Sequence, residues 1–315
     1  MRRRDHARLI RRRRRVALMV LLALVVLVVA GLGAVLGGGG TEDGTKAKAK
    51  PDEPPQLPGG GRRIFPDRRV VAYYGAPQDV ELGALGAGRP AEVARRLRRQ
   101  ARPYAQPRRP VLPAFELIAT VVQADPGEDG DHAQRQSPSV IRRYLRAARR
   151  ENMLLILDIQ PGYLPFIDEV RALERWLREP DVSLALDPEW SMQPPVLPGQ
   201  EIGSTDAATI NEVSAYLSGL VRRYRLPEKL LVVHRFTGDM IVNEDDLARD
   251  RGVALTVNVD GFGDRSNKIS KYRELARGRR DRHHGFKLFY EEDLNLMTPR
   301  RVLRLRPAPE LIVYE

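Results

Sequence analysis

The sequence predicts a (β/α)₈ TIM barrel preceded by one transmembrane helix. Three observations predict it: residues 16–36 form an unbroken apolar run, eight short runs rich in Val, Ile and Leu follow residue 64, and helical patterns alternate with those runs. Strict alternation of strand and helix is typical of parallel α/β architecture. About 250 residues with eight such units fit a closed barrel better than an open sheet, which usually has a Gly-rich phosphate turn after its first strand.

The positive charge of the chain is concentrated at its amino terminus. Of the formal net charge of +12, residues 1–15 contribute +8, nine arginines against Asp5, which leaves +4 for the rest of the chain. A basic surface that binds nucleic acid is therefore not expected on the folded part. The chain has no cysteine, which excludes disulfides, cysteine-ligated zinc and thiol nucleophiles.

Residues 16–36 contain no charged side chain and directly follow the arginines at 11–15. A helix of this length crosses the ~30 Å hydrocarbon core of a bilayer. The positive-inside rule keeps residues 1–15 in the cytoplasm and places the following residues outside the cell membrane. A cleaved signal peptide is the alternative, but its apolar region usually has only about 7–15 residues, which favours an uncleaved single-pass anchor.

Two further segments follow the predicted span. Residues 37–63 consist mainly of Gly, Pro and charged residues, a composition that predicts a disordered tether. Residues 64–315 are expected to form the barrel, as a soluble monomer outside the cell.

The barrel elements are predicted from local patterns. Strands are expected at residues 70–75, 116–123, 153–160, 182–187, 230–236, 252–260, 286–291 and 310–315. Helices are expected at residues 91–100, 139–151, 165–178, 205–224, 266–277 and 294–305, with a short helix at 244–249. The eighth helix is missing from this pattern, and we expect residues 56–69 to cover the gap that it leaves.

Active sites of such barrels lie at the carboxyl ends of the strands, so we searched there for polar side chains. Period-two alternation in strand four puts Ala185, Asp187 and Glu189 on one face and Leu184 and Leu186 on the other. The leucines suit the helix layer, which points the acidic face into the barrel. The same alternation in strand six makes its inward face end in Asp260.

Other strand ends supply further candidates: Asp158 in strand three, His234 in strand five, Lys287 in strand seven, Tyr73 or Tyr74 in strand one, and Trp190 after the acid pair. Each has a structural alternative, since a strand-end acid often caps a helix and a lysine often pairs with an acid. No metal or cofactor is expected, because a metal-dependent hydrolase would need a His-rich ligand set, such as His-x-His on strand one.

Two carboxyl groups at a barrel mouth are the requirement for glycoside hydrolysis. The Asp187-Pro188-Glu189 motif resembles the strand-four Asp-x-Glu of family 18 chitinases and family 25 lysozymes, and Val71-Ala72-Tyr73-Tyr74 is similar to a chitinase first strand. The resemblance implies that Glu189 is the general acid and that Asp187 orients an acetamido group. Ser183 and Ala185 stand where the chitinase pattern has acids.

These observations predict a membrane-anchored glycoside hydrolase that acts on a cell-envelope or extracellular glycan. Glu189 would be the acid, Asp187 and Asp260 its charged partners, and the cleft would be shaped by Tyr73, Asp158, Trp190, His234 and Lys287. The main alternative is a non-catalytic carbohydrate-binding barrel. A metal-dependent hydrolase and a purely structural envelope protein are further alternatives.

Overall fold

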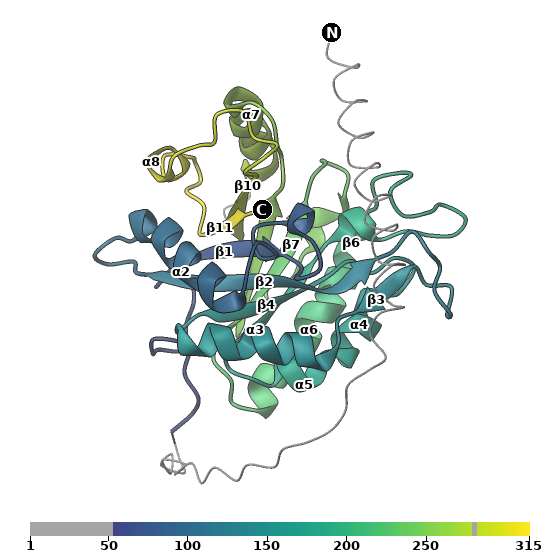
Figure 1. The fold of residues 1–315 in the computed structure, drawn as a ribbon, viewed down its shortest axis with the longest axis horizontal. Helices are drawn as coiled ribbons and strands as arrows, with labels where there is room; N and C mark the ends of the chain where they lie inside the picture. The colour runs from purple at the N-terminus through teal and green to yellow at the C-terminus, as the bar shows by residue number, and fades with distance from the viewer. Residues whose placement is uncertain (1–52, 279–281) are drawn as a thin grey trace. The chain divides into compact units, whose positions relative to one another are not determined.

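A computed structural model describes residues 53–278 and 282–315, and residues 55–315 form one compact unit. Eight parallel strands close into a barrel in the order β1, β2, β4, β5, β7, β9, β10, β11, and β11 pairs back with β1 (Figure 1). A short strand, β3 (Ala133–Arg135), pairs antiparallel with the end of β2. The prediction of a closed (β/α)₈-type barrel is therefore confirmed.

The eight barrel strands lie close to the predicted apolar runs. They are β1 (Arg69–Gly75), β2 (Val111–Val122), β4 (Leu154–Ile159), β5 (Val182–Leu186), β7 (Lys229–Arg235), β9 (Val253–Val259), β10 (His283–Leu288) and β11 (Leu311–Tyr314). Two further strands, β6 (Thr205–Asp206) and β8 (Ile241–Val242), form a separate parallel pair.

Helices follow most of the strands. They are α2 (Pro90–Ala101), α3 (Pro138–Arg150), α4 (Phe166–Ala172), α5 (Glu174–Leu177), α6 (Ala207–Arg223), α7 (Arg265–Ala276) and α8 (Pro299–Val302). Side chains of Ser137, Asp206 and Asp264 accept hydrogen bonds from the first turns of α3, α6 and α7, which satisfies amides that a helix start leaves unpaired. In the view of Figure 1, α3 to α6 lie on one side of the barrel, and α7 and α8 lie on the other.

Three element predictions in the second half of the chain need correction. The helix predicted at residues 294–305 is only the short α8, because Asn295 has a φ of 59°, in the left-handed region that interrupts a helix. The seventh barrel strand is predicted at residues 286–291 but begins at His283. The short helix expected at residues 244–249 is a single 3₁₀ turn, η5 (Glu244–Asp246).

Alternation along the strands sorts their side chains into two cores. The outer core, between strands and helices, includes Leu184 and Leu186, whereas Ala185 belongs to the core inside the barrel. The alternation predicted for strand four is confirmed. Parallel strands of this kind are buried on both faces, which explains their nearly continuous apolar character.

The segment before β1 closes the amino-terminal end of the barrel. Leu57, Ile64 and Phe65 belong to the inner core. The backbone amides of Ile64 and Phe65 donate to Oε2 of Glu228, at 2.5 and 3.1 Å, just before β7 begins. The expectation that residues 56–69 fill the place of a missing helix is therefore wrong. The domain also begins before residue 64, because Leu57 is part of its core.

The membrane span predicted at residues 16–36 lies outside the described residues. Within residues 53–278 and 282–315, no helix is both long and apolar enough to cross a membrane.

Candidate functional site

Buried polar and ionisable side chains gather inside the barrel, toward the carboxyl ends of its strands. Each of the eight strands, or the residue that directly follows it, contributes to this group: Tyr74, Glu116, Asp158, Gln160, Asp187, His234, Asn258, Asp260, Lys287 and Glu315. We call these residues the barrel cluster. Most members are almost inaccessible to solvent, and the carboxylate of Glu315 is the more exposed end of the cluster, with 20% of its side chain accessible.

One half of the cluster is organised by Asp260. Its Oδ2 lies 2.7 Å from Nδ1 of His234 and 3.1 Å from Nζ of Lys287, and its Oδ1 accepts from the Asn258 amide at 2.5 Å. Lys287 Nζ also lies 2.7 Å from Oε2 of Glu315. A buried carboxylate with this many charged and polar donors is well satisfied.

The other half is organised by the hydroxyl of Tyr74. This hydroxyl lies 3.2 Å from Oδ2 of Asp158 and 3.5 Å from Oδ2 of Asp187, and it accepts from the Gln160 amide at 3.0 Å. A phenol has one proton to donate, so the two carboxyl groups compete for it. Lys287 Nζ lies 3.8 Å from the centre of the Tyr74 ring, which connects the two halves by a cation–π contact.

His234 also links the halves through its second ring nitrogen. Its Nε2 lies 3.2 Å from Oε1 of Glu116 and 3.8 Å from Oδ1 of Asp158. Oδ1 of Asp158 and Oε2 of Glu116 are buried and have no hydrogen-bond partner among the described residues. The side-chain oxygen Oδ1 of Asn258 is in the same state. Such oxygens are costly to leave unpaired, and these three are points of the cluster where a further donor would be stabilising.

Burial and charge shift the pKa values of the Tyr74 half upward. Burial raises the pKa of Asp158 to about 7, against the opposing effect of the His234 charge and with a contribution from Glu116. Burial also raises the pKa of Asp187 well above its usual range, and the nearby carboxylates Asp158 and Glu189 add to this. Burial raises the pKa of the Tyr74 hydroxyl well above its usual value. At neutral pH, Tyr74 is therefore a neutral donor and Asp158 is close to its midpoint, and burial favours the protonated form of Asp187.

The Asp260 half is ionised instead. Burial opposes the charge on His234, but the carboxylate of Asp260 outweighs it and raises the His234 pKa well above its usual value. The pKa of Lys287 is raised for the same reason, with Glu315 contributing, and the two cations lower the pKa of Asp260 despite its burial. Two fixed cations thus lie near Asp158, whose pKa is about 7, and near Asp187, whose protonated form is favoured by burial.

The structure brings five of the predicted site residues together in this cluster: Asp158, Asp187, His234, Asp260 and Lys287. Glu189 and Trp190 lie instead in the 3₁₀ turn η4 (Pro188–Trp190), half-buried at the rim. Pro188 turns the chain there, so Asp187 and Glu189 have different surroundings although only one residue separates them.

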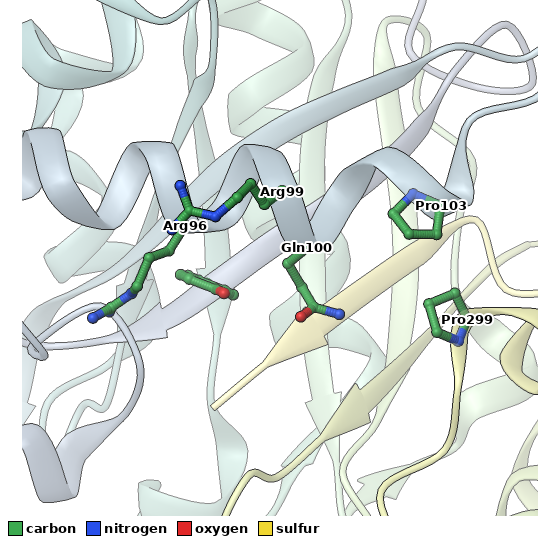
Figure 2. A pocket seen from close by; sticks show the side chains of 6 residues that line it. Arg96, Arg99, Gln100, Pro103 and Pro299 are labelled. Atoms are coloured by element: carbon green, nitrogen blue, oxygen red, sulfur yellow. The ribbon is translucent and has the colours of Figure 1, made fainter.

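Tyr73 points into the outer core rather than into the barrel. Its hydroxyl lies 3.2 Å from that of Tyr290, and its ring contacts that of Tyr314 edge-on. It also lines a cavity of about 430 Å³ whose other walls come from α2, the turn that follows it and α8, with Arg96, Arg99, Gln100, Pro103 and Pro299 (Figure 2). This cavity lies outside the barrel.

Sequence reasoning did not single out Glu116, Gln160, Asn258 or Glu315 as site residues. Glu116 had a signal, since it is the one charged residue within the apolar stretch 111–122. Asn258 shares its inward face with Asp260, and Gly285 opposite it leaves room for its amide, which a side chain at Gly285 would contact.

Among the described residues, no group of three or more His, Asp and Glu side chains has an arrangement that could hold a metal ion.

Comparisons with known proteins leave the family open. No family model and no curated protein matches the chain. Two crystal forms of 2,3-dimethylmalate lyase, a member of the PEP mutase/isocitrate lyase superfamily, are 13% and 14% identical with TM-scores of 0.45 and 0.41. They cover 80% and 79% of this chain and 77% and 74% of their own. A sialic acid aldolase of Ruminococcus gnavus is 9% identical, with a TM-score of 0.40, over 79% of this chain and 68% of its own.

These structures are a lyase and an aldolase and not glycoside hydrolases, so the predicted membership among chitinase-like or lysozyme-like glycosidases is wrong. The Asp-x-Glu motif misled because it is only three residues long, and Ser183 and Ala185 already departed from the chitinase pattern. With TM-scores below 0.5, the activities of these proteins are not carried over to this chain.

Proposed function

We propose that the chain is an acid–base enzyme that removes a proton from, or returns it to, a carbon atom next to the carbonyl group of a small substrate. Asp158 would be the base. The observation that carries the proposal is the state of this carboxyl group: it is buried, its pKa is near 7, and its Oδ1 has no hydrogen-bond partner among the described residues. A general base works best when its pKa lies near the working pH.

The neighbouring groups supply what such a proton transfer also needs, which is stabilisation of an oxyanion. Removal of the proton moves negative charge onto the carbonyl oxygen. Donors that are already fixed near this oxygen lower the activation barrier of the proton transfer, because they do not have to reorganise during the reaction. The hydroxyl of Tyr74 lies beside Asp158 as a neutral donor, and Asp187, whose pKa is raised by burial, would be the second donor in its protonated form. A neutral carboxyl paired with a phenol is an effective oxyanion site in an apolar pocket.

The cations of the other half favour the same developing charge. His234 Nε2 lies 3.8 Å from Asp158, and Lys287 Nζ lies against the Tyr74 ring. In a buried setting, charges at these distances interact more strongly than in water. The carboxylate of Asp260 holds both cations in place and keeps them charged.

Isotope exchange tests this proposal without knowledge of the natural substrate. The full-length chain would be incubated in D₂O with neutral ketones, hydroxyketones and 2-oxo acids, and proton NMR would follow the loss of the signals next to each carbonyl. We expect at least one class to exchange faster than in buffer. Asp158→Asn should slow this exchange by about 10²–10⁴.

The matched control is Asp168→Asn, because Asp168 is an exposed acid that pairs with Arg171 on α4. It should leave the exchange rate unchanged. Exchange that continues at the same rate in Asp158→Asn, with the fold intact by circular dichroism, would show that the cluster is structural.

A further inference from the structure

The face around the barrel mouth differs from the rest of the surface in its apolar side chains. In the part of the chain that the structure describes, six large hydrophobic residues are exposed, and all of them lie in loops that follow the carboxyl ends of strands. They are Val80, Leu197, Ile202, Val242, Tyr290 and Leu294, and Leu294 is the most exposed at 63%. Exposed apolar groups gathered on one face mark a surface that binds something.

The same face also differs in charge. We call residues 76–88, 187–205, 236–246, 260–264 and 289–298 the mouth loops. The chain has 53 lysines and arginines, but none of them is in the mouth loops, whereas each mouth loop contains acidic residues. Exposed examples are Glu81, Glu201, Asp239 and Glu291. The arginines lie on helices such as α2 and α3 instead. The segment that follows β2, residues 123–137, contains Arg135 against four acids.

The barrel interior beneath this face adds a second, independent observation. Oδ1 of Asp158 and Oε2 of Glu116 are buried carboxylate oxygens without a hydrogen-bond partner among the residues described. Both are acceptors. A ligand group that reaches these oxygens has to bring hydrogen-bond donors.

We propose that the mouth loops form a docking surface for a basic polypeptide segment that also carries aliphatic side chains. Charge complementarity requires the partner to be cationic. The six exposed apolar side chains require apolar groups as well, which a polyamine lacks. An anionic lipid surface would be repelled, since the mouth loops have no lysine or arginine to bind its headgroups. The inference shares the unpaired Oδ1 of Asp158 with the proposed function but does not require that proton transfer occurs.

Binding of three labelled peptides of equal length to the full-length chain tests the proposal. One peptide alternates Arg and Leu, the second Arg and Ser, and the third Glu and Leu, and fluorescence anisotropy at physiological salt gives each Kd. We expect the Arg–Leu peptide to bind about tenfold or more tighter than the other two. Its affinity should fall as salt is added, because exposed charges are screened.

Two double variants distinguish the contribution of the apolar side chains of the mouth loops from that of their acidic side chains. Val242→Ser with Leu294→Ser should abolish the preference for the Arg–Leu peptide over the Arg–Ser peptide. Glu201→Lys with Glu291→Lys should weaken both arginine peptides about tenfold or more. The matched control is Glu212→Lys, an exposed acid on α6 outside the mouth loops, which should leave every Kd unchanged.

Three results would overturn the proposal: no binding of the Arg–Leu peptide, equal binding of the Arg–Ser peptide, or an equal loss in Glu212→Lys. Circular dichroism of each variant ensures that a loss of binding is not a loss of fold. Because no turnover is measured, these results stand apart from the outcome of the isotope exchange.

Discussion

Nδ1 of His234 lies 2.7 Å from Oδ2 of Asp260, and both side chains are buried inside the barrel. This pair keeps a positive charge next to carboxyl groups that burial has driven toward their protonated forms. The charge state of the whole cluster therefore depends on one hydrogen-bonded contact.

Asp260→Asn should lower the pKa of His234 and destabilise the fold. Removing one partner of a buried ion pair typically costs about 3–5 kcal/mol, because the other charge is left uncompensated. Nitrogen NMR of the imidazole reports its pKa, and urea unfolding reports the stability. Asp168→Asn, which removes an exposed pair with Arg171, should cost less than about 1 kcal/mol. A His234 that stays charged in Asp260→Asn would contradict this account.

Asp158 should make stability decrease as pH rises. Its folded pKa of about 7 lies above the ordinary value of 3.8, so the folded state holds this proton more tightly than the unfolded state does. The contribution to stability is present below pH 4 and is lost progressively up to about pH 7. The difference in unfolding free energy between wild type and Asp158→Asn, measured by urea titration at pH 5 and pH 8, should therefore change with pH. An unchanged difference would place the carboxyl near its ordinary pKa.

Leu57 should contribute to stability although it lies in the segment assigned to a tether from composition. Its side chain is 3% exposed within the inner core. Leu57→Ala should cost about 2–5 kcal/mol, as expected for a buried leucine, whereas Leu294→Ala at an exposed position should change the unfolding free energy by less than about 0.5 kcal/mol. Equal effects would mean that the segment does not pack against the barrel in solution.

Gly83→Ala should disturb the end of β1. Gly83 has a φ of 123°, and a Cβ at this position would lie 2.5 Å from the carbonyl oxygen of Tyr74. Gly127 also has a positive φ, of 70°, but no atom lies within 4 Å of its Cβ position. Both alanines carry backbone strain, and Gly83, with a ψ of 172°, lies in a region that essentially only glycine adopts. Any additional loss of thermal stability in Gly83→Ala therefore reports this larger strain together with the close approach to Tyr74. Identical melting temperatures would count against that contact.

The membrane orientation inferred from the arginines at 11–15 stays a prediction. Protease added to cells without an outer wall should digest the barrel domain and leave the amino terminus protected, because the positive-inside rule keeps the arginine cluster in the cytoplasm. Epitope tags at the two ends would report each part on a blot. Digestion that requires lysis would reverse the assignment.

The sequence was most informative where the polarity of neighbouring residues differs. Leu184 and Leu186 against Ala185 and Asp187 gave the correct inward face of β5. In β1, Tyr73 and Tyr74 are both aromatic, so alternation alone could not decide which of them faces inward, and the structure places Tyr74 in the cluster.

The residues that were missed depend on contacts between strands that are distant in the chain. Glu116 belongs to the cluster because it contacts His234, which is 118 positions away in the chain, and Glu315 belongs to it because it pairs with Lys287. Such partners follow from barrel closure and register, which a local pattern does not contain. Likewise, composition alone could not show that Leu57 packs beneath the barrel.

The hydrophobic seal that Leu57, Ile64 and Phe65 form at the amino-terminal end has a kinetic consequence. With that end filled, a small molecule that reaches the cluster must enter and leave at the opposite end of the barrel, where the strands have their carboxyl ends. A larger side chain there would slow association and dissociation by the same factor. Occupancy at equilibrium would then be unchanged, while the time needed to reach it would lengthen.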